Sequence, residues 1–198
     1  MKSQIIVTVG REHGSAGHEI ARMIAEQLQI RLYDRQFVEN SDEISGYSME
    51  TACKADEKPV NPFLSRRIGD FSNSIEENVA EKTFEFLRRK ADSGDSFVVV
   101  GRCADYILRD NPNVIRIFIT SEYHEKILRI METNQVSDSK AADIIRKTDR
   151  QRKAYHNYYC DTKWGDSRRY DLLVNSSKLG ISGTVAALLY YIRIFMAK

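Results

Sequence analysis

Cysteine is scarce in this chain, and its spacing excludes the roles that closely paired cysteines play. The three cysteines, Cys53, Cys103 and Cys160, are odd in number and lie far apart, with no Cys-x-x-Cys pair. A disulfide framework and a cysteine-rich metal site are therefore both unexpected. This use of cysteine suits the reducing cytoplasm, which is where we expect the protein to work.

Strong net charge and long apolar runs are also missing. A formal net charge of +2 is too small to predict binding to a nucleic-acid polymer or a membrane surface. The segment before Gly10 is too short for a secretory core. The most apolar segment, VAALLYYIRIFM, has about 12 residues, whereas a membrane span needs about 20. Its apolar residues follow helical spacing, so we expect a docked amphipathic helix and no membrane role.

Several motifs of enzyme chemistry are absent as well. The His-Glu-x-x-His zinc motif and the Gly-x-Ser-x-Gly nucleophile elbow do not occur, so neither class of hydrolase is indicated. The usual phosphate loop, Gly-x-x-x-x-Gly-Lys-Ser/Thr, is not matched either, because no lysine follows Gly17. The sequence does contain a series of anion-binding features at the ends of predicted strands.

Strands and helices alternate along the sequence. Strands are predicted at 4–9, 97–101, 114–120 and 170–177, with a short strand that ends near Asp34. Helical spacing predicts helices over 18–29, 74–90, 137–160 and 182–197, and after residue 120. This alternation predicts a three-layer α/β/α domain with a mostly parallel five-stranded sheet. Residues 41–62 show no sustained period, and we expect them to form an irregular connection.

The loop after the first strand is rich in glycine. It reads GREHGSAGHE over residues 10–19 and leads directly into a helix. Glycines let backbone N–H groups turn toward an anion, and the next helix adds the positive end of its dipole. Arg11 is the first candidate for the missing cation, and His18, with an ordinary pKa of about 6.5, is a weaker one. The alternative is a turn that only joins strand to helix.

Charged residues follow two further strands. Asp34 and Arg35 follow the short strand, where a substrate role and an N-cap with a surface arginine are equally consistent. Arg102 and Asp105 follow the buried run VVV, and a guanidinium there needs an anion or a water-filled cleft. We therefore predict a functional role for Arg102, and interpret Cys103 as a packing residue.

The helical stretch 137–160 carries the basic segment RKTDRQRK. Arg146, Arg150 and Lys153 share one helical face at spacing i, i+4 and i+7, and like charges at that spacing repel each other. One interpretation is a solvated, salt-bridged face. The other is a cationic lid over transferring phosphates, in which arginine neutralises the charge on the phosphoryl oxygens.

Taken together, these segments resemble the nucleoside monophosphate kinases of the P-loop superfamily, most closely the cytidylate kinase-like family. That family opens with a strand, a Ser/Gly-Arg-Glu-aromatic-Gly-Ser-Gly-Gly loop and a helix, to which IIVTVGREHGSAGHEIARMIAEQL is similar. The likeness continues in IRLYDRQFV, FVVVGRCADYIL, TDRQRKAYHNYY, WGDSRRYDLLVNSSKLGI and the last helix, and residues 41–75 have no match. It implies one P-loop domain over 1–198, with an acceptor-side helical insertion at about 35–93 and a lid at about 137–165.

The resemblance also implies site residues. The ATP phosphates would be held by Gly10, Arg11, Glu12, His13, Gly14, Ser15, Ala16, Gly17, His18 and Glu19. Gly17 takes the position of the loop lysine and Glu19 that of the Mg²⁺-binding threonine. Substrate-binding residues would be Asp34, Arg102, Asp105 and Asp149. Catalytic residues would be Arg11, Arg146, Arg150 and Arg152, and no residue is assigned as a metal ligand.

The function expected from this resemblance is ATP- and Mg²⁺-dependent phosphoryl transfer to a nucleoside monophosphate such as CMP or dCMP. Two alternatives stay open. One is a nucleotide-binding regulatory module that has lost catalysis with the lysine, since that lysine follows the phosphates into the transition state. The other is a kinase whose small-molecule acceptor is not a nucleotide. The helical stretch 74–93 and the C-terminal helix could each serve either a homodimer or the core.

Overall fold

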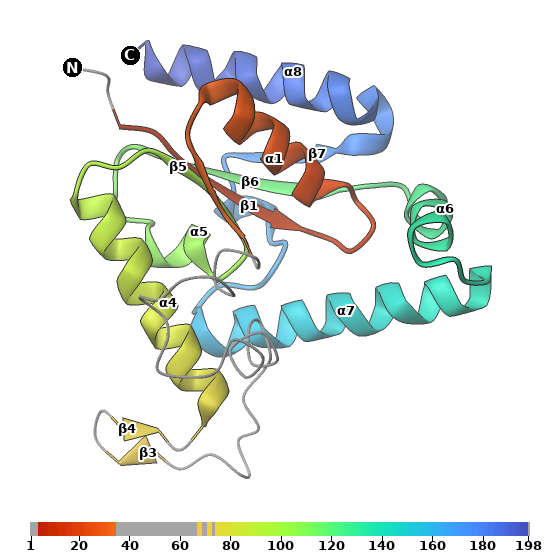
Figure 1. Ribbon diagram of the computed structural model, residues 1–198, viewed down its shortest axis with the longest axis horizontal. Helices are drawn as coiled ribbons and strands as arrows, with labels where there is room; N and C mark the ends of the chain where they lie inside the picture. Colours follow the sequence, from red (N-terminus) through yellow and green to blue (C-terminus); the bar gives the residue numbers. More distant parts are fainter. Residues whose placement is uncertain (1–3, 35–66, 69–70, 73, 198) are drawn as a thin grey trace.

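The structure, a computed structural model, describes residues 4–34, 67–68, 71–72 and 74–197. Its centre is a parallel sheet of five strands in the order β2-β5-β1-β6-β7 (Figure 1). These strands are β1 (Ile6–Arg11), β2 (Arg31–Tyr33), β5 (Phe97–Val100), β6 (Val114–Thr120) and β7 (Leu172–Asn175). Because β1 is central, the loop that follows it lies between the carboxyl ends of β5 and β6.

The inner strands are buried on both faces, which explains their continuous apolar runs. In β1, Ile6 pairs with Phe97 on one side and Val114 on the other. Alternate residues point to opposite faces of a sheet, so Val7 joins the core on one face and Ile6 the core on the other. Both side chains are fully buried.

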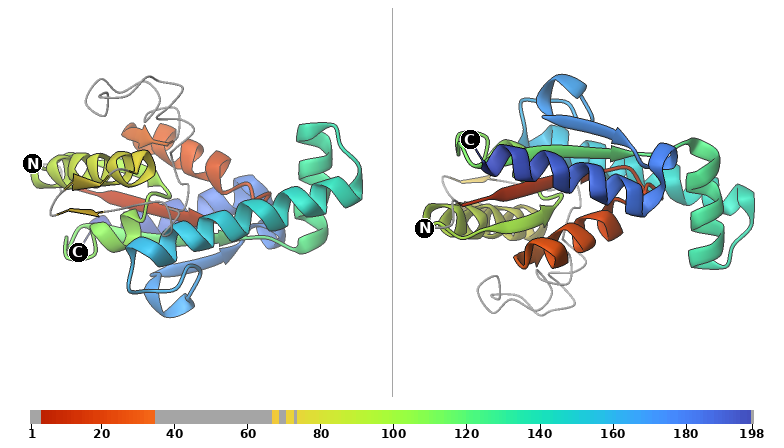
Figure 2. Two further views of the ribbon diagram at one scale, coloured as in Figure 1. Left: turned by 90° about the horizontal axis from the view of Figure 1, so that it is seen from below. Right: turned by 90° about the horizontal axis from the view of Figure 1, so that it is seen from above.

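Helices cover both faces of the sheet, which confirms the predicted three-layer architecture (Figures 1 and 2). On one face, α1 (Gly17–Leu28) and α8 (Ser176–Met196) pack over the core that contains Val7. On the other face, α4 (Ile75–Asp92) and α5 (Ala104–Ile107) pack over the core that contains Ile6.

Two helices extend past one end of the sheet, α6 (Tyr123–Asn134) and α7 (Asp138–Tyr159) (Figure 1). They pack on each other through a small apolar cluster centred on Ile127, Ile130 and Ile145. The predicted N-cap of α7 is confirmed, because the Ser137 hydroxyl accepts a hydrogen bond from the Lys140 N–H. The stretch predicted as a lid forms the helix α7, and the middle part of this helix passes the loop after β1.

Some elements differ from the prediction. The last helix begins at Ser176 and not at 182, and Gly180 breaks it with φ 66° and ψ 178°. The short elements α5 and η1 (Ser167–Arg169) have too few residues to show a period. A two-stranded antiparallel sheet of β3 (Arg67–Ile68) and β4 (Phe71–Ser72) was also not predicted. The predicted irregular segment 41–62, Arg35 and Cys53 lie outside the described residues.

The helix α8 is longer than the apolar segment read from the sequence. Among the described residues it alone has the length and composition of a membrane span, with a mean hydropathy of 1.6. That test does not separate a span from a core helix. Its inner face, made by Val185, Leu188, Leu189 and Ile192, packs in the core with α1. Its outer face leaves Tyr190 and Ile194 exposed.

Two leucines of α8 provide a matched test of this packing. Leu188 is 2% exposed and Leu179 is 57% exposed. We expect Leu188→Ala to lower the free energy of unfolding by about 2–5 kcal/mol, because it leaves a cavity in the core. Leu179→Ala should change it by only about 0.5 kcal/mol. Urea unfolding of the two variants measures the difference, and equal losses would contradict the placement of α8.

Candidate functional site

The loop between β1 and α1 is shaped by small residues. Gly14 has a φ of 78° and Ala16, the N-cap of α1, a φ of 61°, both in the left-handed region. A Cβ on Gly14 would lie 3.0 Å from the Cβ and the carbonyl oxygen of Lys126. The helix α6 therefore packs directly against this loop, and glycine is needed there for both its conformation and its size.

The start of α1 is a site for an anion. Among the described residues no side chain caps this helix end, so its first N–H groups are not taken by a capping oxygen. Together with the positive end of the helix dipole, such N–H groups bind phosphate. His18 and Glu19 of the first turn are exposed, and the His18 ring lies 2.7 Å from Asp34 Oδ2.

Arg11 occupies the space that a side chain at residue 17 would need. A Cβ on Gly17 would lie 2.5 Å from the Cβ of Arg11 and 3.2 Å from its Cγ. Real Cβ atoms do not approach other carbons that closely. A lysine at residue 17 and an arginine at residue 11 therefore exclude each other. Glycine at residue 17 is therefore the residue that fits beside the stem of Arg11.

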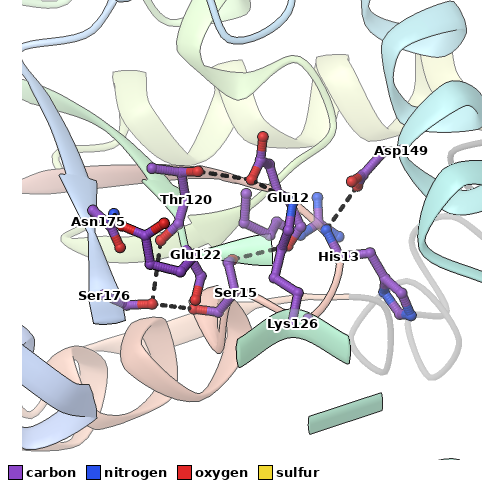
Figure 3. Close-up of polar contacts among 12 residues, drawn as sticks. Glu12, His13, Ser15, Thr120, Glu122, Lys126, Asp149, Asn175 and Ser176 are labelled. Atoms are coloured by element: carbon purple, nitrogen blue, oxygen red, sulfur yellow. Dashed lines mark hydrogen bonds and ion pairs between the residues drawn. The ribbon is translucent and has the colours of Figure 1, made fainter. Parts of the chain in front are cut away.

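The lid helix contacts the loop through two residues one helical turn apart, and Figure 3 shows the first of them, Asp149. Asp149 Oδ1 accepts a hydrogen bond of 2.7 Å from the His13 backbone N–H. Arg152 Nη1 donates to the Arg11 carbonyl oxygen at 3.2 Å. Burial raises the pKa of Asp149, although the His13 N–H and the Arg152 charge oppose this. Burial, together with Arg152 and Arg11, lowers the pKa of His13 to about 4, so its ring is neutral.

The helix α6 adds two cations that sequence reasoning missed. Lys126 is buried, and its Nζ lies 2.9 Å from Glu12 Oε2, which also accepts a hydrogen bond from Thr120 Oγ1 at 2.7 Å (Figure 3). Arg129 donates to the Gly14 carbonyl oxygen. The sheet order would have indicated these two cations, because a helix that follows the strand next to β1 begins beside the loop.

The other side of the site lies at the carboxyl end of β5. Gly101, Arg102 and Cys103 have φ values of 78°, 57° and 54°, and consecutive left-handed residues of this kind are typical of functional sites. Arg102 is 2% exposed, and its Nη1 donates to the Val100 carbonyl oxygen at 2.5 Å. Asp105 Oδ2 lies 3.0 Å from His156 Nε2 of α7.

A small cavity of about 20 Å³ joins the two sides. It brings together five predicted site residues, Gly10, Arg11, Arg102, Asp105 and Arg152. The structure does not bring Arg146 and Arg150 to the loop, since Arg146 pairs with Asp143 of its own helix and Arg150 is exposed. Asp34 is buried just after β2 and pairs with His18.

The residues of the loop fit the phosphates of a nucleotide. The glycine positions, the N-terminus of α1 and the Arg11 side chain supply donors and positive charge. Across the described part of the chain, no group of three or more His, Cys, Asp or Glu residues gathers to hold a metal ion.

His156 provides a test of the contact between α7 and β5. Burial alone lowers its pKa, but hydrogen bonds to Asp105 and Cys160 raise it more, to about 10. The protonated His156 ring therefore stabilises the folded state fully below pH 6.5, and this stabilisation is lost as the pH rises toward 10. We expect an NMR titration of the ring to show no deprotonation near neutral pH, and Asp105→Asn to bring it into that range. Asp110→Asn, at an exposed carboxylate, is the control, and a wild-type ring that titrates near 6.5 would contradict the assignment.

Comparison with known proteins places the chain in a family. The model of the cytidylate kinase-like family matches residues 6–178. No match is found among curated proteins. Among solved structures, an uncharacterized protein from Eubacterium ventriosum ATCC 27560 is 35% identical with a TM-score of 0.76, over 96% of this chain and 99% of that one.

More distant structures share the fold. A shikimate kinase from Bacteroides thetaiotaomicron is 12% identical with a TM-score of 0.54, over 96% of this chain and 98% of that one. The shikimate kinase from Aquifex aeolicus vf5 is 12% identical with a TM-score of 0.52, over 96% of each chain. At this identity the likeness shows the fold alone, which is that of P-loop kinases. Because the match to the family model covers most of its length, the chain belongs to the cytidylate kinase-like family.

Proposed function

We propose that this protein is an ATP- and Mg²⁺-dependent phosphotransferase that transfers the γ-phosphoryl group of ATP to a nucleoside monophosphate such as CMP or dCMP. The observation that carries this proposal is the contact between Arg11 and Gly17. The stem of Arg11 fills the space of a side chain at residue 17, so we assign the cationic role of the loop lysine to Arg11, in a chain of the cytidylate kinase-like family. On this proposal the loop is a rearranged phosphate site.

On the donor side, backbone N–H groups of the loop and the Arg11 side chain would hold the phosphates. Glu19, in the first turn of α1, would help to hold Mg²⁺, which neutralises charge on the β- and γ-phosphates. Phosphoryl transfer needs little covalent chemistry from the protein, so positioning and charge supply most of the catalysis. The absence of a nucleophile motif from the sequence agrees with this mechanism.

On the acceptor side, Arg102 would orient the substrate, together with Asp34 and Asp105. Arg102 is held in a strained backbone at the carboxyl end of β5, where ligands bind in open parallel sheets. The lid would then supply Arg146, Arg150 and Arg152. Of these, Arg152 already lines the cavity with Arg102, whereas Arg146 and Arg150 would need α7 to move.

A second candidate is a kinase whose acceptor is not a nucleotide. A cleft of about 640 Å³ lies between α4, α5 and α7, and one of its lining residues, Tyr106, follows Asp105 in the sequence. Three glutamates and one arginine line it with aromatic and apolar residues: Glu77, Glu81, Glu85, Arg88, Phe84, Tyr106, Ile107, Tyr158 and Tyr159. Carboxylates repel a phosphate monoester, so an acceptor bound in this cleft would be a neutral or cationic molecule with a free hydroxyl.

One assay separates these candidates. Purified protein is incubated with ATP, Mg²⁺ and single acceptors, including CMP, dCMP, other nucleoside monophosphates and small amino alcohols, and ADP is measured. ADP that depends on CMP or dCMP supports the proposal, and ADP that depends on an amino alcohol supports the second candidate. Nucleotide binding without ADP under any condition would contradict both and leave a regulatory module.

The Arg11–Gly17 contact predicts the behaviour of a reconstructed loop. We expect Arg11→Ala to weaken ATP binding at least tenfold, about 1.4 kcal/mol, because the loop loses its cation. Gly17→Lys alone should destabilise the fold, since its side chain meets Arg11. The double variant R11G/G17K removes the clash, restores the usual loop lysine and should recover ATP affinity in calorimetric titration.

The matched control for this series is Arg22→Ala. Arg22 is an exposed arginine of α1 that pairs with Glu26, so its loss should leave ATP affinity within about twofold. Unchanged affinity in Arg11→Ala would remove Arg11 from the phosphate site. A double variant that folds but binds no better than Arg11→Ala would show that the lysine position is not where the cation acts.

A further inference from the structure

The lid helix places a carboxylate on the phosphate loop. Asp149 Oδ1 lies 2.7 Å from the His13 backbone nitrogen and accepts a hydrogen bond from its N–H (Figure 3). Backbone N–H groups of such a loop are the donors that a phosphate uses. Asp149 thus makes with the loop the same kind of contact that a phosphate oxygen would make, a charge-assisted hydrogen bond to an N–H.

The surroundings of this carboxylate are arranged for an anion. The three cations that act on the His13 ring come from three different elements: Arg11 of β1, Lys126 of α6 and Arg152 of α7. Lys126 and Arg152 also act on the Asp149 carboxylate. Glu12, which pairs with Lys126, repels it. The three cations outnumber the two carboxylates of Asp149 and Glu12, which suits an anionic ligand.

A gain in the stability of the fold does not explain the contact between the Asp149 carboxylate and the loop. Its burial disfavours the charged form more than its N–H bond and the neighbouring cations favour it, and Glu12 adds repulsion, so the pKa is raised. A carboxyl group with a raised pKa stabilises the fold less when it is ionised than when it is protonated. A loss of folding stability at a buried charged residue is typical of positions that serve function.

A phosphate oxygen and the Asp149 carboxylate cannot share the His13 N–H. One donor would have to serve two anions in contact, and their like charges repel each other at that distance. Phosphate binding at this N–H therefore requires Asp149 to leave. Arg152 lies one turn further along α7 and donates to the Arg11 carbonyl oxygen, so a movement of α7 that removes Asp149 also releases Arg152 from the loop backbone.

We infer that Asp149 is an internal competitor of the donor phosphates, which bind by displacing its carboxylate from the His13 N–H and shifting α7. This inference rests on the proposed function, in that it takes the loop to bind the triphosphate of ATP. It assigns the lid a second task besides supplying arginines. Donor binding and lid movement become one event, because the same N–H cannot serve both partners.

The test compares Asp149→Asn with Asp143→Asn. The probes are inorganic tripolyphosphate and ATP with Mg²⁺, each titrated calorimetrically without an acceptor. We expect Asp149→Asn to bind both probes roughly 5- to 20-fold more tightly, because the competing charge is gone and the side chain keeps its shape. Asp143 lies on the same helix and pairs with Arg146 at the surface, so Asp143→Asn should stay within about twofold.

A second readout follows the lid itself. Trp164 is the single tryptophan of the chain and lines the cavity beside Arg152. Tripolyphosphate should change its fluorescence in the wild type, and Asp149→Asn should show part of that change before any addition. Asp149→Ser replaces Asp149→Asn if the latter does not fold, and thermal unfolding of both should give a Tm at or above that of the wild type.

The outcomes separate this inference from the proposed function. Equal or weaker tripolyphosphate binding by Asp149→Asn overturns the inference, because Asp149 would then have no effect on phosphate binding or would strengthen it. Absence of tripolyphosphate binding by both wild type and Asp149→Asn also overturns it, because no phosphate then competes. Tighter binding in the variant, with no ADP formed from any acceptor, supports the inference while the proposed phosphotransferase activity fails.

Discussion

The site depends on one steric contact, between the stem of Arg11 and the bare Cα of Gly17. The two residues cannot both carry side chains, because a Cβ at residue 17 would lie 2.5 Å from that of Arg11. In the proposed site, the cationic side chain of the loop is therefore that of Arg11, at the end of β1 and not at the start of α1. The conformation of the loop is otherwise that of a phosphate site, with Gly14 in the left-handed region and an N-terminus of α1 that no described side chain caps.

The sheet order then decides what surrounds this loop. Because β1 lies between β5 and β6, the elements that follow those strands bring Arg102 and Lys126 to either side of it. The lid helix α7 spans both sides, with Asp149 on the loop and His156 on Asp105 at the end of β5. A rigid movement of α7 would therefore change the contacts on the donor side and on the acceptor side at the same time. This arrangement suits phosphoryl transfer, in which both substrates must be aligned before the lid closes.

Local patterns in the sequence predicted the framework well, and tertiary contacts decided the rest. The sequence predicted all five strands, the three inner ones from continuous apolar runs, and Ser137 predicted the start of α7, because these signals act within a few residues. The loop and Arg11 were also predicted as an anion site. Lys126 was missed, since its role depends on packing of α6 against Gly14, far away in sequence. The pairing of Asp105 with His156 joins residues 51 positions apart, and no local pattern signals it.

The central claim is that Arg11 takes the place of the loop lysine on the donor phosphates. A crystal structure of the protein with Mg²⁺ and a non-hydrolysable ATP analogue tests it most directly. The claim predicts that a nitrogen of the Arg11 guanidinium lies about 2.7–3.2 Å from an oxygen of the β- or γ-phosphate. A triphosphate bound on the loop with the Arg11 guanidinium turned away from it, and another cation in that position, would contradict the claim.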